Sequence, residues 1–498
     1  MFIRLANIIR CCGVFVLTML CALSYNVSAQ VLGTSTNYSG SRGLAVNPSL
    51  MTTSFVYSDF GLNVGISAYN NFAFVKASDL HNILTGGGFS DYYKNGKRYD
   101  FDFVMNTKPK YFYETLDLKV LSTMYNFNGK NAFGLFVNNR VYASGTRIPW
   151  EILEIGVVSM EDGDYSGKNY HSENSKAGVM AWSEVGIAYS LTVKDRYYDK
   201  IDVGVTAKGL LGYAAAAVNL KEVDKYIINS DSTIIHKVDM TAAMSAPIDY
   251  SADFADGEVF DKNKIVNGWG AGVDIGVTYT HKREEKMAGV VKRPCTFPKI
   301  HYNWRLGVSL LDVGAIRFNK NARVYRYFTE EDKEFDISRF EGVSNFDSMM
   351  DTLNSMFYEN LADARDGESF VMGLPTALSV QFDYNIWRGF YVNSTLVQPL
   401  RFWKYSAARP AMLTVSPRYE SSYFDFSLPV SLYNYERIMI GLELRLAFLT
   451  VGTQNIFNFI GVGKSYGLDA YVALKFNLYK GKCWKKVIKD SCWNADFR

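Results

Sequence analysis

Residues 438–447 read IMIGLELRLA, and their alternation decides the fold class. Ile438, Ile440 and the leucines at every second position after them fall on one side of an extended chain, because neighbouring side chains of a strand point to opposite faces. Glu443 and Arg445 fall on the other side, together with small residues. One face is therefore apolar and the other carries charge, which is typical of a strand with lipid on its outer side.

The same two-residue period recurs along the chain. Apolar residues alternate with Asp202 and Lys208 in IDVGVTAKG (201–209), and with Asp274 in GVDIGVTYT (272–280). Similar strands are expected at 60–68, 115–123, 132–141, 184–193, 302–312, 376–386, 390–398, 412–419, 423–432 and 468–478. Their length of about 9–11 residues suits a tilted strand that crosses a bilayer.

The connections define a topology. The strand count is even, at about fourteen, if residues 447 and 448 form a tight turn and 449–455 return as a separate strand, and bacterial single-chain barrels have even numbers. Long connections at 69–114, 142–183, 213–269 and 313–375 alternate with short ones for most of the chain, as expected for long outer loops and short periplasmic turns. The connection at 281–301 is longer than this rule predicts. We therefore predict an all-β fold, an antiparallel transmembrane β-barrel.

Composition agrees with this class. The chain has 34 Tyr, 33 Phe and 39 Gly but only 11 Pro. Its mean hydropathy is close to zero, as expected when an oily face and a polar face are averaged. The formal net charge of +3 gives no indication of a nucleic-acid partner, and the expected surroundings are outer-membrane lipid.

Residues 1–29 have the features of a signal peptide. Arg4 and Arg10 precede an apolar stretch at 11–23, and small residues stand at 27–29, where a signal peptidase cleaves. We therefore expect an exported protein in the cell outer membrane. Its predicted parts are the signal peptide at 1–29, an N-terminal plug or hatch at 30–56, the barrel at 57–479 and a periplasmic basic tail at 480–498.

The stretch GSRGLAVNPSLM (40–51) before the first strand fits neither a strand nor a helix, because it is rich in glycine and its Asn-Pro step disfavours helix at Asn47. Irregular backbone is tolerated at membrane depth only away from lipid. We therefore expect this segment to fold into the lumen as a plug. The alternative is a simple turn that leads into the strand, with Asn47 bonded to its own backbone.

AVNPSL (45–50) resembles the Asn-Pro-Ala motif in the N-terminal hatch of the long-chain fatty-acid channel (FadL-like) family. LPTALSVQFDY (374–384) and WRLGVSLLDVGAIRF (304–318) resemble an uncharacterised family of Bacteroidetes outer-membrane barrels, distantly similar to FadL-like channels and to type IX secretion PorV-like proteins. The resemblance implies a hatch that contains Asn47, Pro48 and Ser49, although Ser49 stands where the motif has Ala. It also implies passive transport of small hydrophobic molecules.

Residues 344–362, SNFDSMMDTLNSMFYENLA, are predicted to form a helix in the longest outer loop, capped by Ser344 and Asp347. Side chains at helical spacing form an apolar face, which contains Phe346, Met349, Met350, Leu353, Met356 and Phe357. This face either packs over the barrel mouth or offers an adaptable, Met-rich surface where an apolar ligand first binds.

Charged residues on the inward side of the strands are expected to line the lumen. They are Asp202, Lys208, Asp274, Asp383, Glu443, Arg445, Asp469 and Lys475. Because their signs are mixed, we expect them to pair across the lumen rather than to line an ion path. A lumen crossed by such pairs argues against a simple apolar tunnel.

No enzyme is predicted. GVGKS (461–465) lacks the glycine that a phosphate-binding loop needs at position 458, and no Gly-x-Ser-x-Gly elbow occurs. The five histidines are scattered without paired spacing, so neither a metal site nor a cofactor is expected.

The C-terminal tail contains the remaining candidates. Cys483 and Cys492 flank WKKVIKDS and are candidates for a small disulfide loop in an oxidising compartment. The lysines of the tail are either solvated or dock a partner.

Two functions of different classes follow. The first is passive transport of small hydrophobic molecules across the outer membrane. The second is a non-transporting barrel scaffold that anchors or hands on secreted proteins, with a protein partner at the outer loops or the basic tail. A continuous apolar cavity would favour transport, and a lumen sealed by paired charges beneath large ordered loops would favour the scaffold.

Overall fold

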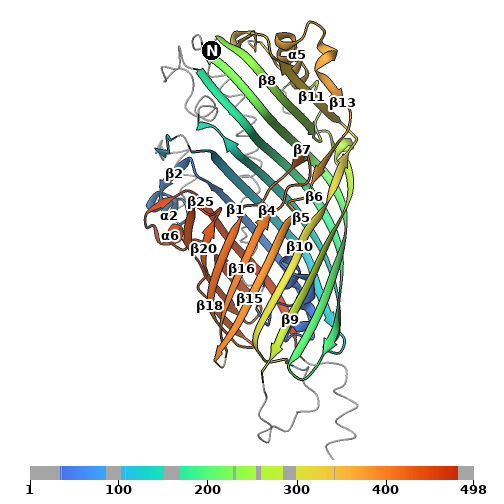
Figure 1. Ribbon diagram of the computed structural model, residues 1–498, viewed down its shortest axis with the longest axis vertical. Coiled ribbons are helices and arrows are strands. Elements are labelled where there is room, and N and C mark those ends of the chain that lie inside the picture. Colours follow the sequence, from blue (N-terminus) through green and yellow to red (C-terminus); the bar gives the residue numbers. More distant parts are fainter. Residues whose placement is uncertain are drawn as a thin grey trace, which may run out of the picture.

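The computed structural model describes residues 34, 36–85, 102–106, 108–150, 169–227, 232–253, 259–283, 299–340, 342–387 and 389–479. Within them, fourteen antiparallel strands close into a barrel (Figure 1). The circle closes where β1 pairs with β25 on one side and with β4 on the other. The spanning strands are β1 (Ser58–Asn70), β4 (Lys110–Asn126), β5 (Asn131–Ile148), β6 (Asn169–Asp195), β7 (Asp199–Ile227), β9 (Gly268–Lys282), β10 (Tyr302–Phe318), β15 (Ala377–Trp387), β16 (Phe390–Pro399), β18 (Met412–Glu420), β19 (Phe424–Ser427) with β20 (Val430–Tyr433), β21 (Arg437–Ile440) with β22 (Leu442–Leu446), β23 (Leu449–Thr453) and β25 (Gly467–Leu478).

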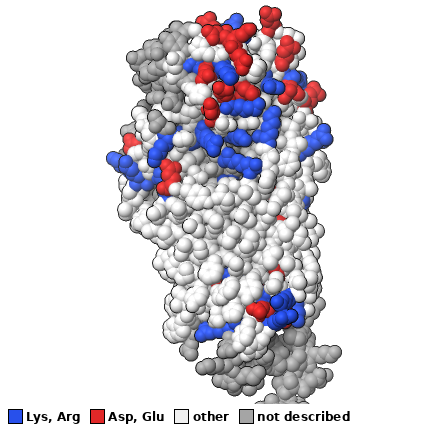
Figure 2. All heavy atoms as spheres, in the orientation of Figure 1, with Lys and Arg blue, Asp and Glu red and all other residues white. Residues whose placement is uncertain are grey.

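The alternation along each strand separates an apolar outside from a polar inside. Ile438 is 72% exposed, whereas Glu443 and Arg445 are each 3% exposed. The outward positions are the ones that face lipid in a membrane barrel. Figure 2 shows a broad belt almost free of charged side chains on the visible face, with charged groups above and below it. The predicted fold class, an antiparallel transmembrane barrel, is confirmed.

Two neighbouring strands are interrupted at the same level. Residues 428 and 429 separate β19 from β20, and Gly441 separates β21 from β22. The Gly441 amide donates to the Pro429 carbonyl (2.7 Å), so the two breaks lie side by side. Pro429 has no amide to continue the ladder. Ala447, in the left-handed region (φ 51°), then forms the tight turn into β23 that makes the strand count even.

The outer connections are largely sheet rather than loop. The outer half of β7 pairs with β8 (Ser232–Ser245), which pairs with β11 (Ala322–Thr329) and β12 (Lys333–Asp336). β11 also pairs with β13 (Arg365–Gly367), and β14 (Phe370–Gly373) pairs with the outer end of β10. We call β8, β11, β12, β13 and the outer half of β7 the outer sheet, which stands above the barrel in Figure 1. The prediction of long loops at 213–269 and 313–375 was wrong to this extent.

Helix α5 (Phe346–Phe357) lies on the outer sheet, near η4 (Ile337–Phe340) and η5 (Leu361–Ala364). Its cap is Asn345, whose side chain accepts from the Ser348 amide (2.8 Å), so the cap predicted from Ser344 and Asp347 was wrong. Met350, Met356 and Phe357 are buried against residues of β7, β8 and β11. The apolar face therefore packs on the outer sheet.

A small lobe lies beside the upper ends of β1 and β25 (Figure 1). It consists of β2 (Ala73–Lys76), β3 (Asp102–Phe103), β24 (Lys464–Ser465), α2 (Ala77–Thr85) and α6 (Phe457–Ile460). The short elements η3 (Lys262–Lys264) and β17 (Tyr405–Ser406) complete the description.

No helix in the described part of the chain has the length and apolar character needed to cross a membrane.

The predicted signal peptide at 1–29, the tail at 480–498 and its candidate disulfide between Cys483 and Cys492 lie outside the described residues.

Candidate functional site

The N-terminal residues fill the barrel from the inside. We call residues 36–57 the lumenal segment; it contains η1 (Gly40–Ala45) and η2 (Pro48–Thr53), drawn in blue within the barrel in Figure 1. Every residue of it except Ala45 is buried. Leu44, Met51 and Phe55 share an apolar cluster with Phe136 on the wall. The segment thus occupies the place where the sequence predicts a plug.

Asn47 fixes the lumenal segment to the wall. Its Oδ1 accepts hydrogen bonds from the Ser49 amide (3.0 Å) and hydroxyl (2.6 Å), which caps η2. Its Nδ2 donates to Gln381 Oε1 (3.0 Å) and to the Val277 carbonyl (3.3 Å). The Ser49 hydroxyl also bonds Thr278 Oγ1 (2.6 Å). Asn47 therefore bonds the backbone of its own turn and also contacts the barrel wall, and its role in a hatch stays a prediction.

Glycines on two adjacent strands make room for this anchor. Gly204 on β7 pairs with Gly276 on β9. A Cβ at Gly204 would lie 2.4 Å from the Ser49 nitrogen, and a Cβ at Gly276 would lie 2.1 Å from Asn47 Oδ1. No other residue allows the backbone to come so close. The wall is therefore shaped to receive residues 47–49.

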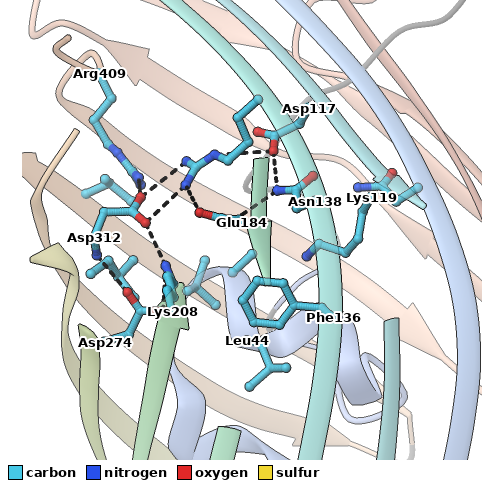
Figure 3. Close-up of a pocket in the computed structure, with 16 residues that line it drawn as sticks. Leu44, Asp117, Lys119, Phe136, Asn138, Glu184, Lys208, Asp274, Asp312 and Arg409 are labelled. Atoms are coloured by element: carbon cyan, nitrogen blue, oxygen red, sulfur yellow. Dashed lines mark hydrogen bonds and ion pairs between the residues drawn. The ribbon is translucent and has the colours of Figure 1, made fainter. Parts of the chain in front are cut away.

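Above the lumenal segment, Asp312 is the centre of a buried charge network (Figure 3). Its carboxylate accepts hydrogen bonds from Arg140 Nη1 (3.0 Å), Arg140 Nη2 (3.2 Å) and Lys208 Nζ (2.6 Å). Arg409 also donates to it. Arg140 and Asp312 lie on β5 and β10, which are not neighbours in the sheet, so this pair bridges the lumen.

Further acids balance the cations of this network. Asp274 accepts from the Asp312 amide (2.7 Å) and lies 2.8 Å from Lys208 Nζ. Arg140 also pairs with Glu184 (3.3 Å) and Asp117 (3.4 Å). The charged residues around the central cavity are four acids and four bases, namely Asp117, Glu184, Asp274, Asp312, Lys119, Arg140, Lys208 and Arg409. The network is thus formally neutral, as expected because buried charges are stable only when they are paired.

A second buried group ties the lumenal segment to β10, β15 and β18. Arg418 forms a bidentate pair with Asp383 (2.8 Å to each oxygen), which Arg305 also contacts (3.2 Å). Arg305 Nη1 donates to the Thr53 hydroxyl (3.1 Å), and the Asn37 amide donates to Glu420 (3.1 Å). The segment is therefore anchored by polar contacts at several points.

The lumen charges predicted from the alternation all lie inside and are buried. Lys208 and Asp274 belong to the network of Asp312. Asp202 pairs with Lys200 (2.9 Å) on its own strand, and Arg445 pairs with Asp425 on a neighbouring strand (2.7 Å). These pairs join near neighbours rather than crossing the lumen.

The remaining predicted charges contact the lumenal segment or neutral groups. Lys475 donates to the Ser39 carbonyl (2.7 Å), and Glu443 interacts electrostatically with Arg42. Asp469 accepts from the Tyr69 hydroxyl (2.5 Å). The prediction of pairing across the lumen therefore applies best to the bridge between Arg140 and Asp312, which the alternation did not identify.

The space left at the level of the network is small. A cavity of about 70 Å³ lies between the lumenal segment and the charges. A polar cavity of this size has room for a few water molecules. The lumen is therefore filled and polar at this level.

A larger basin opens about six residues further out along β4 and β5, roughly 20 Å at the rise of a strand. Its volume is about 810 Å³. Its lining includes Tyr111 and Tyr113, which are buried. Around it stand Lys108, Lys110, Arg147, Lys176 and Arg401, with Glu436 as its one lining acid among the described residues. Among the described residues, Arg147, Lys176 and Arg401 have no ion-pair partner.

Two residues at the basin have a strained backbone. Arg147 (φ 56°) and Asn174 (φ 57°) both adopt the left-handed region, which is uncommon outside glycine. They lie on the adjacent strands β5 and β6, and the Ser175 hydroxyl donates to the Arg147 carbonyl (2.6 Å). Such strain concentrates at functional sites, which makes the basin a candidate binding site.

Several residues of the site were missed from the sequence. Asp117 and Arg140 occupy inward positions of strands predicted at 115–123 and 132–141, so the alternation contained their signal. Asp312 could not be found from the alternation, because a register shift between Leu310 and Val313 turns both Leu311 and Asp312 toward the inside. Arg409 lies in a connection with no period at all.

A model of a protein family described as a family of unknown function, DUF5723, matches residues 45–454. No curated protein matches the sequence.

Solved structures of hydrocarbon channels match the chain, as the resemblance to FadL-like proteins implied. The toluene transporter TbuX of Ralstonia pickettii is 9% identical with a TM-score of 0.37, over 89% of this chain and 95% of that chain. The monoaromatic hydrocarbon channel CymD is 7% identical with a TM-score of 0.32, over 90% and 95%. A FadL homologue of Pseudomonas aeruginosa is 9% identical with a TM-score of 0.23, over 86% and 91%. Similarity at this level transfers no ligand and no activity.

Proposed function

This chain belongs to DUF5723, a family of unknown function, and we propose that it is an outer-membrane channel for small hydrophobic molecules that carry a negative charge. The observation that carries the proposal is the basin at the barrel mouth. Its lining combines two tyrosines with cations that have no carboxylate partner among the described residues. An apolar body would lie on Tyr111 and Tyr113, and an anionic group would pair with Arg401 or Lys176.

Passage beyond the basin requires the lumenal segment to move. The segment acts as a plug in this proposal, with Asn47, Pro48 and Ser49 as its hatch. Besides its apolar contacts, it is attached to the wall by hydrogen bonds, which exchange readily for bonds to water once the lumen is wetted. The neutral network around Asp312 then lines a polar path rather than a greasy one.

Substitutions Lys176→Ala and Arg401→Ala are expected to weaken binding of an amphipathic anion. A hydrogen bond to a charged group contributes roughly 1.5 kcal/mol, so each variant should raise the dissociation constant by about tenfold. The probe is 2-naphthoate, titrated into the detergent-solubilised protein by calorimetry, with neutral 2-naphthamide in parallel.

Lys333→Ala, on the outer sheet, is the matched control and should leave binding unchanged. Binding of 2-naphthoate should also weaken with salt, because exposed charges are screened. Equal affinity for the acid and the amide, or no binding of either, would contradict the proposal. Proteoliposome swelling in 2-naphthoate measures passage separately from binding.

The scaffold remains a second candidate, since two observations favour it. The lumen is filled at the level of Asp312, and the outer sheet offers a large ordered surface. A scaffold needs neither the basin cations nor movement of the lumenal segment. Binding of 2-naphthoate without any swelling of proteoliposomes would therefore favour this second function.

A further inference from the structure

A histidine and three carboxylates meet at the outer ends of β6 and β7. His171 lies directly opposite Asp224, and Glu173 lies directly opposite Glu222. The His171 Nδ1 atom bonds the Asp224 carboxylate, and its Nε2 atom lies 3.1 Å from Glu173 Oε1. All four side chains are on one face, because residues two apart in a strand point the same way.

Among the described residues, too few lysines and arginines pair with the carboxylates of this cluster to balance their charge. Like charges directly opposite each other destabilise a strand pair, and here Glu173 opposes Glu222. Lys237 pairs with Glu222 (3.0 Å), but it also approaches Glu330 (3.7 Å). No described lysine or arginine pairs with Glu173 or Asp224. A cation between the strands would remove this repulsion.

We propose that His171, Glu222 and Asp224 bind a divalent transition-metal ion such as zinc. Their ligand atoms lie within 4.8 Å of one another, and the side chains are exposed or half-buried, so small rotations bring them to the bond lengths of about 2.0–2.2 Å that zinc requires. One nitrogen and two carboxylate oxygens with open positions for water form a chemically suitable set.

Glu173 supplies the outer contact that such a site needs. A histidine that binds a metal through one nitrogen usually donates its other N–H to a carboxylate, which fixes the tautomer and the ring. Glu173 Oε1 is in place to accept from His171 Nε2, which leaves Nδ1 to face Asp224 and the metal. Glu173 is thus a positioning residue, whereas His171, Glu222 and Asp224 are the ligands.

The site also has a consequence for the basin. Asn174, which lines the basin in a left-handed conformation, directly follows Glu173. A metal that clamps β6 to β7 would hold this wall of the basin in place. Sequence spacing could not indicate the site, because the ligands come from two strands and are about fifty residues apart, as read from their numbers.

The test is zinc binding by the tag-free full chain in detergent, measured by calorimetry and by competition with a chromophoric chelator. We expect one zinc ion per chain. His171→Gln should abolish stoichiometric binding, and Glu173→Gln should weaken it by about tenfold, as is typical for loss of an outer contact. His236→Gln is the matched control, because His236 is also exposed (44% against 53%), lies on the outer sheet and pairs with a single carboxylate, Asp332.

The zinc-binding measurements on these variants either support or overturn the metal site. Stoichiometric zinc binding that survives His236→Gln and is lost in His171→Gln supports it. Absence of zinc binding by the unaltered chain overturns the proposal, and so does equal loss of binding in both histidine variants. His171 would then only bridge Asp224 and Glu173 by hydrogen bonds. Heat-modified gel mobility reports whether each variant is folded, so that a failed barrel is not mistaken for a lost site.

Discussion

Substitution Asp312→Asn is expected to destabilise the barrel by about 3–5 kcal/mol, because it leaves buried cations without their partner. Arg140, Lys208 and Arg409 all bind this carboxylate, and all three are buried. An asparagine of equal size keeps the shape and removes only the charge. The free energy of unfolding can be measured by guanidinium titration in micelles, followed by tryptophan fluorescence.

Two companion variants sharpen this experiment. Asp332→Asn removes an exposed carboxylate from an ion pair with His236 and should change stability little, since exposed pairs contribute little. Lys208→Gln combined with Asp312→Asn restores the balance of charge and should recover part of the loss. An unchanged unfolding midpoint for Asp312→Asn alone would mean that the network is hydrated and contributes no stability.

The alternation predicted the barrel because lipid imposes a strict rule on every spanning strand. Polar backbone must be paired and outward side chains must be apolar, so each strand, even the short β23 (Leu449–Thr453), carries its own signal. The outer halves of β6 and β7 stand outside this rule. There apolar and polar residues do not alternate, as in the run AAAAV (214–218), so the pattern could not predict that β7 continues to Ile227.

The site was predictable only as far as the same rule extends. The alternation placed Asp202, Lys208 and Asp274 inside the barrel, but it could not show which charged groups form ion pairs with one another. Arg140 and Asp312 are far apart in the sequence, and the bulge that turns Asp312 inward breaks the period used to read the strand. Pairing inside a lumen is a property of the closed ring, which no single strand contains.

The second large effect concerns the lumenal segment. Substitution Gly204→Leu is expected to force it off the wall, because a Cβ there would lie 2.4 Å from the Ser49 nitrogen and 2.5 Å from the Pro48 carbonyl carbon. Gly204 is paired on both sides, with Ser190 and with Gly276. The ladder resists displacement more than the segment does, so the segment should move.

Displacement should open the lumen to water and ions. Barrels wider than those filled by their own side chains hold an aqueous channel, so we expect the single-barrel conductance in planar bilayers to rise on the order of tenfold. Gly209→Leu is the matched control on the same strand, since a Cβ there meets no atom within 4 Å. Equal conductance of the two variants would mean that residues 47–49 do not close the barrel.

A crosslink tests the same movement of the lumenal segment by preventing it. The Ser49 and Thr278 hydroxyls are 2.6 Å apart, so Ser49→Cys with Thr278→Cys, in a chain whose other cysteines are replaced by serine, places two thiols where a disulfide can form. Oxidation should hold the segment against β9 and stop swelling of proteoliposomes in 2-naphthoate, and reduction should restore it. Swelling that continues in the oxidised protein would show that the solute passes without release of the hatch, and the plug would then be a fixed part of the wall.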